Sequence, residues 1–382
     1  MKISIVTETF LPSTDGVVTR LRASIDYLID QGHEIQVIAP DLGVQSYRNI
    51  RFDGVQPRTF FLYKHRKFGM PTRQIKTYLE DFNPDLVHVV NPAFMGYSGI
   101  KYGKKLGVPL IASYHTHAPK YADHYKVPWA EPLLWWHFRR MHNQADLNLC
   151  TSQAILEELN EQNFYNVHLW KRGVDTERFN PELRDESMRE RLTEGNPDKT
   201  LLLFVGRLAF EKEIDTLIPM LEEKQDAHLA IVGDGPYREQ LEKNFSHLNN
   251  VTFTGFMHGE ELATAYASSD AFMFPSTTET LGLVILEAMA SGLPVVAAAS
   301  GPTNEQVDDG ATGLLYRSGE DGNLTETIAR LEDKNLQQQM SKRAFSHSRA
   351  FGWHGPAKQL LDIYESALDV KQEQEEGQQA VQ

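Results

Sequence analysis

The sequence predicts an α/β protein with two doubly wound, parallel-sheet domains. Its 382 residues, 41% of them hydrophobic, suffice for two domains at ~100–200 residues each. Short apolar runs alternate with longer helical patterns along the chain, as expected for βα units that form parallel sheets. The series of runs restarts near residue 200, so two separate sheets are expected.

The first series begins at residues 3–6, and Leu21, Ile25 and Leu28 then mark one face of a helix. We expect the strands of the first domain at residues 3–6, 34–39, 86–90, 110–114 and 147–150. Those of the second domain are expected at residues 201–205, 229–232, 251–253, 271–274 and 295–298. Ligands of such sheets bind beyond the carboxyl ends of the strands, and the cleft between two such domains is the natural site.

The domain boundary is expected where Lys171, Arg172 and Gly173 interrupt the strand pattern. The first domain then spans residues 1–170 and the second residues 171–355, with a helix at about 356–370 packing back on the first. Residues 371–382 are rich in Gln and Glu without apolar periodicity, which predicts a disordered tail.

Composition excludes several classes of protein. The net charge of -14 argues against a nucleic-acid partner. A single cysteine, Cys150, cannot form an internal disulfide or a cysteine-built zinc cluster, and it fits a reducing cytoplasm. The start of the sequence does not read as a secretory signal, and no segment approaches the ~20 apolar residues of a membrane span. Residues 1–170 carry 18 Lys and Arg against 16 Asp and Glu, and residues 171–382 carry 20 against 36.

The strongest functional motif runs from Glu279 through Thr280 and Leu281 to Gly282, between a predicted strand and a predicted helix. We expect free N–H groups at Thr280, Leu281 and Gly282 to bind a diphosphate, because helix starts bind anions and glycine lets the ligand approach the backbone. Glu279 would accept hydrogen bonds from sugar hydroxyls and Glu287 from a ribose. The structural alternative is one helix-start carboxylate and one solvated carboxylate.

A second motif, Gly206-Arg207 with Lys212, follows the predicted strand at 201–205. Two cations at a strand's carboxyl end suit a leaving diphosphate, with Arg207 bidentate and Lys212 as a point charge. The structural alternative is a surface salt bridge. Backbone groups of Gly255, Phe256 and Met257 would read a nucleobase edge.

The first half carries weaker signals. Gly16 starts a helix, but the sequence there lacks the G-x-G-x-x-G pattern of a dinucleotide site. His115 and His117 end a predicted strand, where a structural role for His117 is as consistent as a catalytic one. No Asp-x-Asp pair occurs to hold Mg²⁺ on a diphosphate, so we expect the cations and the helix start to stabilise the leaving group without a metal or other cofactor.

Together, Glu279-x7-Glu287, Gly206-Arg207, Lys212 and residues 172–175 resemble the family 4 retaining glycosyltransferases. The resemblance implies a GT-B fold, in which two facing Rossmann-like domains enclose a cleft. Longer segments at residues 7–12, 15–21, 88–92, 112–117, 142–152 and 169–177 resemble cyanobacterial sulfoquinovosyltransferases. Residues 301–305 depart from the Gly-Gly-Ile-Pro-type turn of many relatives.

The resemblance implies that the donor binds the second domain and the acceptor the first. It places Arg207 and Lys212 on the diphosphate, Glu287 on the ribose and Glu279 on the sugar, and His115 faces the reacting carbon. Gly16 and Arg172 are expected at the donor as well. In such enzymes the acceptor hydroxyl enters on the face that the diphosphate leaves, and a diphosphate oxygen takes its proton.

The implied substrates are UDP-sulfoquinovose and diacylglycerol. A sulfonate needs cationic or multi-donor surroundings, and the candidates are Arg20, His115, His117 and Lys120. A transferase using UDP-glucose or a mannose donor remains open. So do an epimerase or phosphorylase of the same architecture and a non-catalytic protein that binds a sugar nucleotide.

A lipid acceptor suggests a cytoplasmic protein peripherally attached to an anionic membrane. The candidate contact residues are Trp129, Trp135, Trp136, Arg139 and Arg140, because tryptophan favours the headgroup level and arginine favours anionic lipid. The segment at residues 63–68 adds basic and aromatic groups. The structural alternative is a core helix that ends in arginines.

Overall fold

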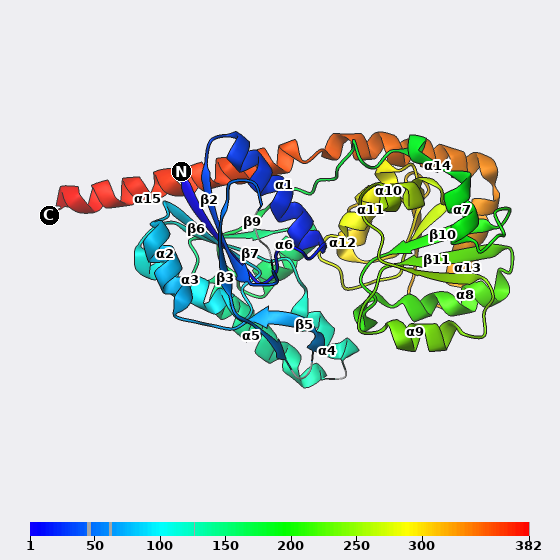
Figure 1. The fold of residues 1–382 in the computed structure, drawn as a ribbon, viewed down its shortest axis with the longest axis horizontal. Helices are drawn as coiled ribbons and strands as arrows, with labels where there is room; N and C mark the ends of the chain where they lie inside the picture. Colours follow the sequence, from blue (N-terminus) through cyan, green and yellow to red (C-terminus); the bar gives the residue numbers. More distant parts are fainter. Residues whose placement is uncertain (44–46, 61–62, 126, 382) are drawn as a thin grey trace. The chain divides into compact units, whose positions relative to one another are not determined.

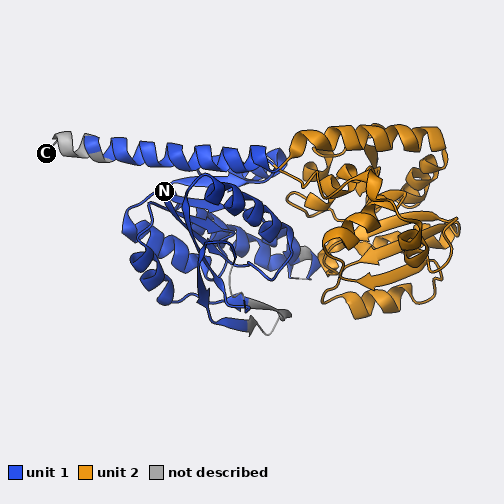
Figure 2. Cartoon of the chain, turned by 45° about the horizontal axis from the view of Figure 1, so that its top comes forward, with its two compact units in different colours: residues 1–171, 353–382 blue, residues 172–352 orange. Residues whose placement is uncertain are grey.

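The computed structural model describes residues 1–382 except 44–46, 61–62, 126 and 382. The chain forms two compact units, residues 1–171 with 353–382 and residues 172–352 (Figure 2). The sequence analysis placed these boundaries at 170 and 355.

Unit 1 contains a seven-stranded sheet in the order β3-β2-β1-β6-β7-β8-β9, and every pair in it is parallel (Figure 1). Its strands are β1 (Lys2–Thr7), β2 (Glu34–Pro40), β3 (Arg51–Val55), β6 (Leu86–Val90), β7 (Leu110–Ser113), β8 (Leu147–Cys150) and β9 (Val167–Leu169). A separate antiparallel hairpin joins β4 (Pro57–Phe60) to β5 (Tyr63–Gly69).

The helices of unit 1 are α1 (Gly16–Asp30), α2 (Gln74–Phe82), α3 (Gly96–Leu106), α4 (Ala118–His124), α5 (Glu131–His142), α6 (Gln153–Glu161) and α15 (His354–Val381), with a short 3₁₀ turn η1 (Pro128–Ala130). Asp15 starts α1 by accepting a hydrogen bond from the Val18 amide at 3.1 Å. Ile3 and Ile5 of β1 pack in the cluster that contains α1 and α15 residues, whereas Val6 packs in the cluster of α2 and α3. Alternate residues of the central strand therefore pack on opposite faces, as a sheet covered by helices on both sides requires.

Unit 2 contains a six-stranded parallel sheet in the order β12-β11-β10-β13-β14-β15. Its strands are β10 (Thr200–Val205), β11 (Ala227–Val232), β12 (Val251–Gly255), β13 (Ala271–Phe274), β14 (Val295–Ala298) and β15 (Gly313–Tyr316). The helices are α7 (Glu186–Leu192), α8 (Ile218–Glu223), α9 (Arg238–Phe245), α10 (Gly259–Ala267), α11 (Leu283–Ala290), α12 (Gly301–Asn304), α13 (Asn323–Ala329) and α14 (Lys334–Ser348). The 3₁₀ turns are η2 (Pro181–Leu183), η3 (Phe210–Lys212), η4 (Ile214–Leu217), η5 (Arg330–Glu332) and η6 (Arg349–Phe351).

Two parallel-sheet α/β domains were predicted, and the fold class is confirmed. The sequence analysis missed β3, β9 and β15 and the hairpin. The tail differs as well, since α15 continues as helix to Val381 where disorder was expected from residue 371. Gln, Glu and Lys are good helix formers, so a segment without an apolar face can still extend a helix that is already nucleated. In the described part of the chain, no helix has the length and apolarity needed to span a bilayer.

Candidate active site

The loops that follow β10 and β13 meet at the carboxyl edge of the sheet in unit 2. Glu213 adopts a left-handed conformation, with φ of 55°, and its carboxylate accepts hydrogen bonds from the Thr277 amide at 2.6 Å and hydroxyl at 2.7 Å. The Ser276 hydroxyl donates to the carbonyl of Glu211 at 3.0 Å. These bonds fix the segment with the predicted cations against the segment with the predicted acidic motif.

Both predicted cations are paired with carboxylates. Arg207 Nη2 donates to Glu211, whose side chain is 1% exposed. Lys212 Nζ donates to Glu279, and these two side chains are 19% and 18% exposed. Burial, followed by the nearby charge of Arg207, lowers the pKa of Lys212 to about 8. The structure therefore brings Arg207, Lys212 and Glu279 together and adds Glu211, which the sequence analysis did not single out.

Helix α11 begins later than predicted. It starts at Leu283 with Gly282 as its N-cap, so the amides of Gly282, Leu283 and Val284 lack an intrahelical acceptor, whereas those of Thr280 and Leu281 precede the helix. Gly282 has a φ of 69°, and a Cβ there would lie 2.9 Å from Cζ of Phe274. Only glycine fits this position without strain, which explains why the chain turns into the helix one residue after it.

Thr280 and Leu281, the other residues of the predicted anion site, are 5% and 7% exposed. The carbonyl of Leu281 accepts a hydrogen bond from Gln306 Nε2. Gly282 and Val284, in contrast, are partly exposed.

Glu287 lies on α11, and its Oε2 accepts a hydrogen bond from the Tyr266 hydroxyl at 3.0 Å. Burial raises the pKa of Glu287 to about 7. A carboxylate with this pKa is partly protonated at neutral pH, so it is a hydrogen-bond acceptor whose strength depends on pH.

Close backbone packing joins the loops after β10 and β11. A Cβ on Gly233 would lie 1.9 Å from the carbonyl oxygen of Gly206, and one on Gly235 would lie 2.2 Å from that of Leu208. The sequence analysis predicted that Gly206 contacts the sugar-nucleotide donor. The close approach of the carbonyls of Gly206 and Leu208 explains why glycine is also required at 233 and 235.

Gly255, Phe256 and Met257, which were predicted to contact a nucleobase, lie in three different environments. The carbonyl of Gly255 accepts a hydrogen bond from the Gly233 amide at 2.8 Å. Met257 is buried in the core, whereas Phe256 is 59% exposed and stacks on His258 with the ring centroids 5.8 Å apart. Phe256 is thus the exposed member of the three.

Arg172 lies at the start of unit 2 and contacts a different loop from Arg207. Its Nη2 donates to the carbonyl of Glu305 at 2.8 Å, and its guanidinium lies 5.2 Å from the ring centroid of Phe351. Burial lowers the pKa of Arg172. The residue ties the unit boundary to the loop after α12.

In unit 1, His115 lies at the carboxyl end of β7. Its Nε2 is 2.9 Å from Ser113 Oγ, and its ring centroid lies 5.6 Å from that of Trp170. Burial, followed by the charge of Arg20, lowers the pKa of His115 well below the usual value, so the imidazole is neutral. Gly16, the first residue of α1, follows the capping Asp15 in the same unit.

The four predicted sulfonate ligands form two groups. The guanidinium of Arg20 lies 3.9 Å from the ring centroid of Trp170, the ring that His115 also contacts. His117 Nε2 and Lys120 Nζ instead both contact Glu158, at 2.7 and 3.4 Å. Glu158 therefore balances two of the four candidates, whereas Arg20 and His115 share contacts with Trp170.

Arg20 is buried and pairs with backbone, not with an acid. Its Nη2 donates to the carbonyls of Trp170 and Lys171, whereas Nε and Nη1 have no hydrogen-bond partner within the described residues. Burial lowers the pKa of Arg20 to about 9. A guanidinium in such surroundings favours a nearby anion.

The predicted membrane residues lie on η1 and α5, and some of them are buried. Trp135 is buried in a core cluster, and Arg139 donates to the carbonyl of Gln162 at 3.2 Å, so both have structural roles. Trp129 and Trp136 are 75% and 49% exposed, and the Arg140 guanidinium lies 5.6 Å from the Trp136 ring. Within the segment at 63–68, the side chains of residues 63–67 lie outside the described residues.

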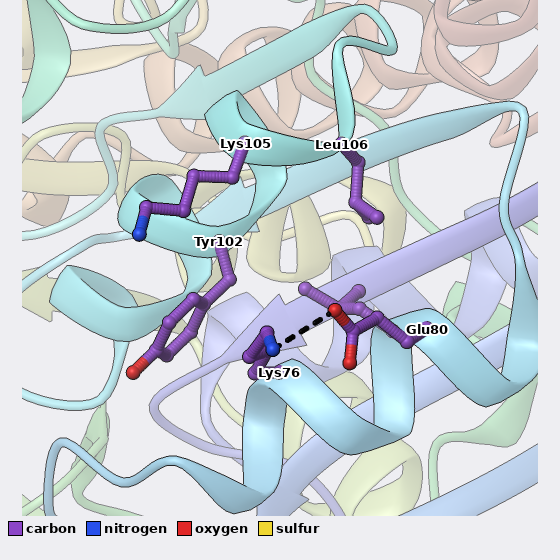
Figure 3. Close-up of a pocket in the computed structure, with 6 residues that line it drawn as sticks. Lys76, Glu80, Tyr102, Lys105 and Leu106 are labelled. Carbon is purple, nitrogen blue, oxygen red and sulfur yellow. Dashed lines mark ion pairs between the residues drawn. The ribbon is translucent and has the colours of Figure 1, made fainter.

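Among the described residues, no three His, Cys, Asp or Glu side chains are grouped so that they could hold a metal ion. A small cavity between α2 and α3 contains the Lys76–Glu80 ion pair of 3.2 Å and is lined also by Tyr102 and Lys105 (Figure 3). No residue predicted to bind a ligand lines this cavity.

Cations and backbone amides at the strand ends of a doubly wound domain suit the binding of a phosphate-containing ligand. Comparisons with known proteins agree. Residues 14–178 match the family model "Glycosyltransferase Family 4", and residues 186–347 match "Glycosyl transferases group 1". The chain belongs to glycosyltransferase family 4, whose members are retaining enzymes of the GT-B fold.

Three relatives bear on specificity. The chain is 36% identical to sulfoquinovosyl transferase SQD2 of Arabidopsis thaliana, over 92% of this chain and 71% of the relative. It is 37% identical to a GDP-mannose-dependent alpha-mannosyltransferase of Mycobacterium tuberculosis, over 96% and 97% of the two chains. It is 29% identical to alpha-monoglucosyldiacylglycerol synthase of Streptococcus pneumoniae, over 96% and 86%. Among solved structures, sucrose-phosphate synthase from Thermosynechococcus elongatus has the same fold, with a TM-score of 0.77 and 21% identity over 97% of this chain and 99% of that one.

Proposed function

We propose that this enzyme transfers sulfoquinovose from UDP-sulfoquinovose to diacylglycerol with retention of anomeric configuration, giving sulfoquinovosyldiacylglycerol and UDP. The observation that carries the proposal is the pairing of Arg207 and Lys212 with carboxylates at the strand ends of unit 2. The relatives named as a sulfoquinovosyl transferase and as a synthase of alpha-monoglucosyldiacylglycerol support the choice of donor and acceptor.

The donor diphosphate binds by exchange with Glu279. A diphosphate carries more charge than a carboxylate and takes Lys212, which frees the Glu279 carboxylate to accept hydrogen bonds from sugar hydroxyls. Arg207 shares the phosphate charge while Glu211 keeps its side chain oriented. Glu287 accepts from the ribose, and the amides at the start of α11 face the phosphates.

Transfer forms a bond between the anomeric carbon and the acceptor oxygen and breaks the bond from that carbon to the diphosphate. The hydroxyl proton passes to a diphosphate oxygen, so the step needs no protein base. Arg207 and Lys212 stabilise the charge that develops on the leaving group, and no metal ion or other cofactor is required. Neutral His115 is proposed to lie beside the reacting carbon, as the family resemblance implies.

Arg20 is the group proposed to favour the sulfonate. It is a buried cation whose described contacts are backbone carbonyls and the Trp170 ring, with no carboxylate partner among the described residues. His117 and Lys120 are not proposed for this role, because Glu158 pairs with both.

The lipid acceptor is proposed to be reached from an anionic membrane surface. Trp129, Leu133 and Trp136 are exposed apolar side chains on η1 and α5, with Arg140 beside Trp136. Exposed tryptophan next to arginine suits the headgroup region of a bilayer. Flotation with anionic vesicles tests this contact, and a Trp129→Ala/Trp136→Ala variant should lose binding while Trp135, inside the core, is left intact. Equal flotation of the variant and the wild type would reject the proposed membrane contact of these tryptophans.

A UDP-glucose- or mannose-donor transferase acting on a lipid or soluble acceptor is the second candidate. The mannosyltransferase relative, matched over nearly the whole length of both chains, favours it. A screen of UDP-sulfoquinovose, UDP-glucose and GDP-mannose against diacylglycerol micelles, with the product mass measured, separates the two. Transfer from UDP-sulfoquinovose at the highest kcat/KM is expected, and preference for either of the remaining donors would overturn the proposal.

The ratio of activities with two donors tests Arg20 without interference from stability. Arg20→Gln should lower kcat/KM for UDP-sulfoquinovose about 10-fold or more relative to UDP-glucose, because the loss of a charged hydrogen bond affects only the sulfonated donor. Lys120→Ala is the matched control, since Lys120 is paired with Glu158. Equal losses for both donors in Arg20→Gln would reject this role.

A further inference from the structure

A chain of buried hydrogen bonds leads from the C-terminal helix to His115. The Tyr364 hydroxyl of α15 lies 2.6 Å from His88 Nδ1, His88 Nε2 lies 2.8 Å from Ser113 Oγ, and Ser113 Oγ lies 2.9 Å from His115 Nε2. Tyr364, His88 and Ser113 are completely buried. The hydroxyl groups of Tyr364 and Ser113 and the ring of His88 therefore hydrogen-bond within this chain, not with bulk water.

The protonation states of these groups limit where the hydrogens of the chain can lie. Burial lowers the pKa of His88 to about 3 and raises the pKa of Tyr364, so His88 is a neutral imidazole and Tyr364 keeps its proton. Each imidazole in the chain then has one N–H donor and one acceptor nitrogen. Apart from an arrangement in which both imidazoles donate to Ser113 and leave its hydrogen without a described acceptor, two arrangements of protons satisfy all three hydrogen bonds.

The Tyr364 hydroxyl decides between the two arrangements. Among the described residues it has one hydrogen-bond partner, His88 Nδ1. If His88 donated from Nδ1, the Tyr364 hydrogen would be buried without an acceptor, which disfavours that arrangement by about 10-fold or more. Tyr364 therefore donates to His88 Nδ1, and His88 donates from Nε2 to Ser113.

Ser113 connects the hydrogen bond from His88 to His115. Its hydroxyl has two described partners, His88 and His115. Since His88 donates to it, the Ser113 hydrogen goes to Nε2 of His115, and the proton of neutral His115 must be on Nδ1. The tautomer of His115, which follows β7, is thus decided by Tyr364 on α15, 276 positions from its contact His88 on β6.

We propose that Tyr364, His88 and Ser113 are positioning residues that fix the ring of His115 and hold it in the Nδ1–H tautomer. In this form His115 presents a donor, not a lone pair, at Nδ1, so it can hydrogen-bond an oxygen of the donor sugar but cannot accept the acceptor's proton there. The catalytic consequence rests on the proposed function, whereas the tautomer itself does not.

The tautomer can be measured directly by long-range ¹H–¹⁵N correlation NMR of the full chain labelled on its 14 histidines, with a His115→Ala variant to identify the signal. We expect the Nδ1–H pattern for His115 in the wild type. Tyr364→Phe should add an Nε2–H population of at least about one tenth, because the group that biases the direction is gone. Tyr78→Phe is the matched control, because that hydroxyl donates to the Gly54 carbonyl at 3.2 Å within the same unit.

An Nε2–H pattern for His115 in the wild type, or an unchanged pattern in Tyr364→Phe, would overturn the relay. In the transfer assay Tyr364→Phe should lower kcat in proportion to the lost Nδ1–H population of His115, with the donor KM nearly unchanged, while Tyr78→Phe changes neither. A changed tautomer with full kcat would overturn the catalytic consequence. The NMR result stands whichever sugar donor the enzyme uses, so failure of the relay and failure of the proposed function are distinguishable.

Discussion

Exchange of Lys212 between Glu279 and the donor diphosphate makes two substitutions act in opposite directions. Lys212→Met keeps the length of the side chain and removes its charge. A hydrogen bond to a charged group contributes about 1.5–3 kcal/mol, so the Kd for UDP should rise about 10- to 150-fold. Glu279→Gln removes the carboxylate that competes for Lys212, so UDP should bind about 3-fold more tightly or better.

Transfer should behave differently from binding. Lys212→Met should lower kcat by about 10²-fold or more, since charge develops on the diphosphate as the sugar leaves. Glu279→Gln should also lower kcat despite tighter UDP binding, because the sugar hydroxyls lose a charged acceptor. The double variant should bind UDP about as Lys212→Met does, because Glu279 acts on UDP through Lys212.

Isothermal titration with UDP and a coupled UDP-release assay measure the two effects. Lys212 is the cleaner position for the experiment, because its partner Glu279 is 18% exposed and retains some solvation when unpaired. Weaker UDP binding by Glu279→Gln, similar in size to that of Lys212→Met, would refute the exchange. Full activity of Lys212→Met would refute the role of the cation altogether.

Three further results are expected. Arg207→Met should lower the free energy of unfolding by about 3–5 kcal/mol, measured with urea, because it removes the cation that pairs with the buried carboxylate of Glu211; a loss no larger than that of Lys212→Met would contradict this. The folded-state pKa of Glu287, about 7, lies above its ordinary 4.5, so the contribution of Glu287 to the free energy of unfolding is fully present below pH 4.5 and is lost as pH rises through 7, by up to roughly 3 kcal/mol. Glu287→Gln should flatten that part of the curve of unfolding free energy against pH, and an unchanged curve would contradict the raised pKa. Turnover should survive chelation by EDTA, and a loss restored by Mg²⁺ would show that a metal shares the work of Arg207 and Lys212.

The sequence predicted the inner strands well because strands buried on both faces are continuous apolar runs. All five residues of β6 are buried, and so are five of the six residues of β1. The edge strand β3 reads RFDGV and is mostly half-exposed, and β9 has only three residues, so neither leaves a clear pattern. The segment becomes a strand because it pairs with β2, which its composition alone does not indicate.

The candidate site residues also differ in how far the sequence could predict them. Arg207, Lys212, Glu279 and Glu287 were identifiable because short loops and a helix start carry them in fixed spacing. Their partners were not, because convergence in space joins distant segments. Glu158, for example, comes from α6 to bind both His117 and Lys120. The relay to His115 depends on Tyr364, which no local pattern connects to β6.

The uneven charge of the chain predicts how salt would affect its proposed contact with a membrane. Residues 171–382 carry 36 acidic against 20 basic side chains, so an anionic surface repels this half over a distance of ~10 Å at 0.1 M salt. Attraction by residues 1–170 is weak, since 18 basic side chains oppose 16 acidic ones, and the exposed Trp129 and Trp136 add an apolar contribution that salt does not screen. If these tryptophans dominate, flotation with anionic vesicles should persist or increase at about 1 M salt, where the screening length is ~3 Å. Release of the protein from the vesicles at that salt concentration would show instead that Arg140 and other basic groups hold it there.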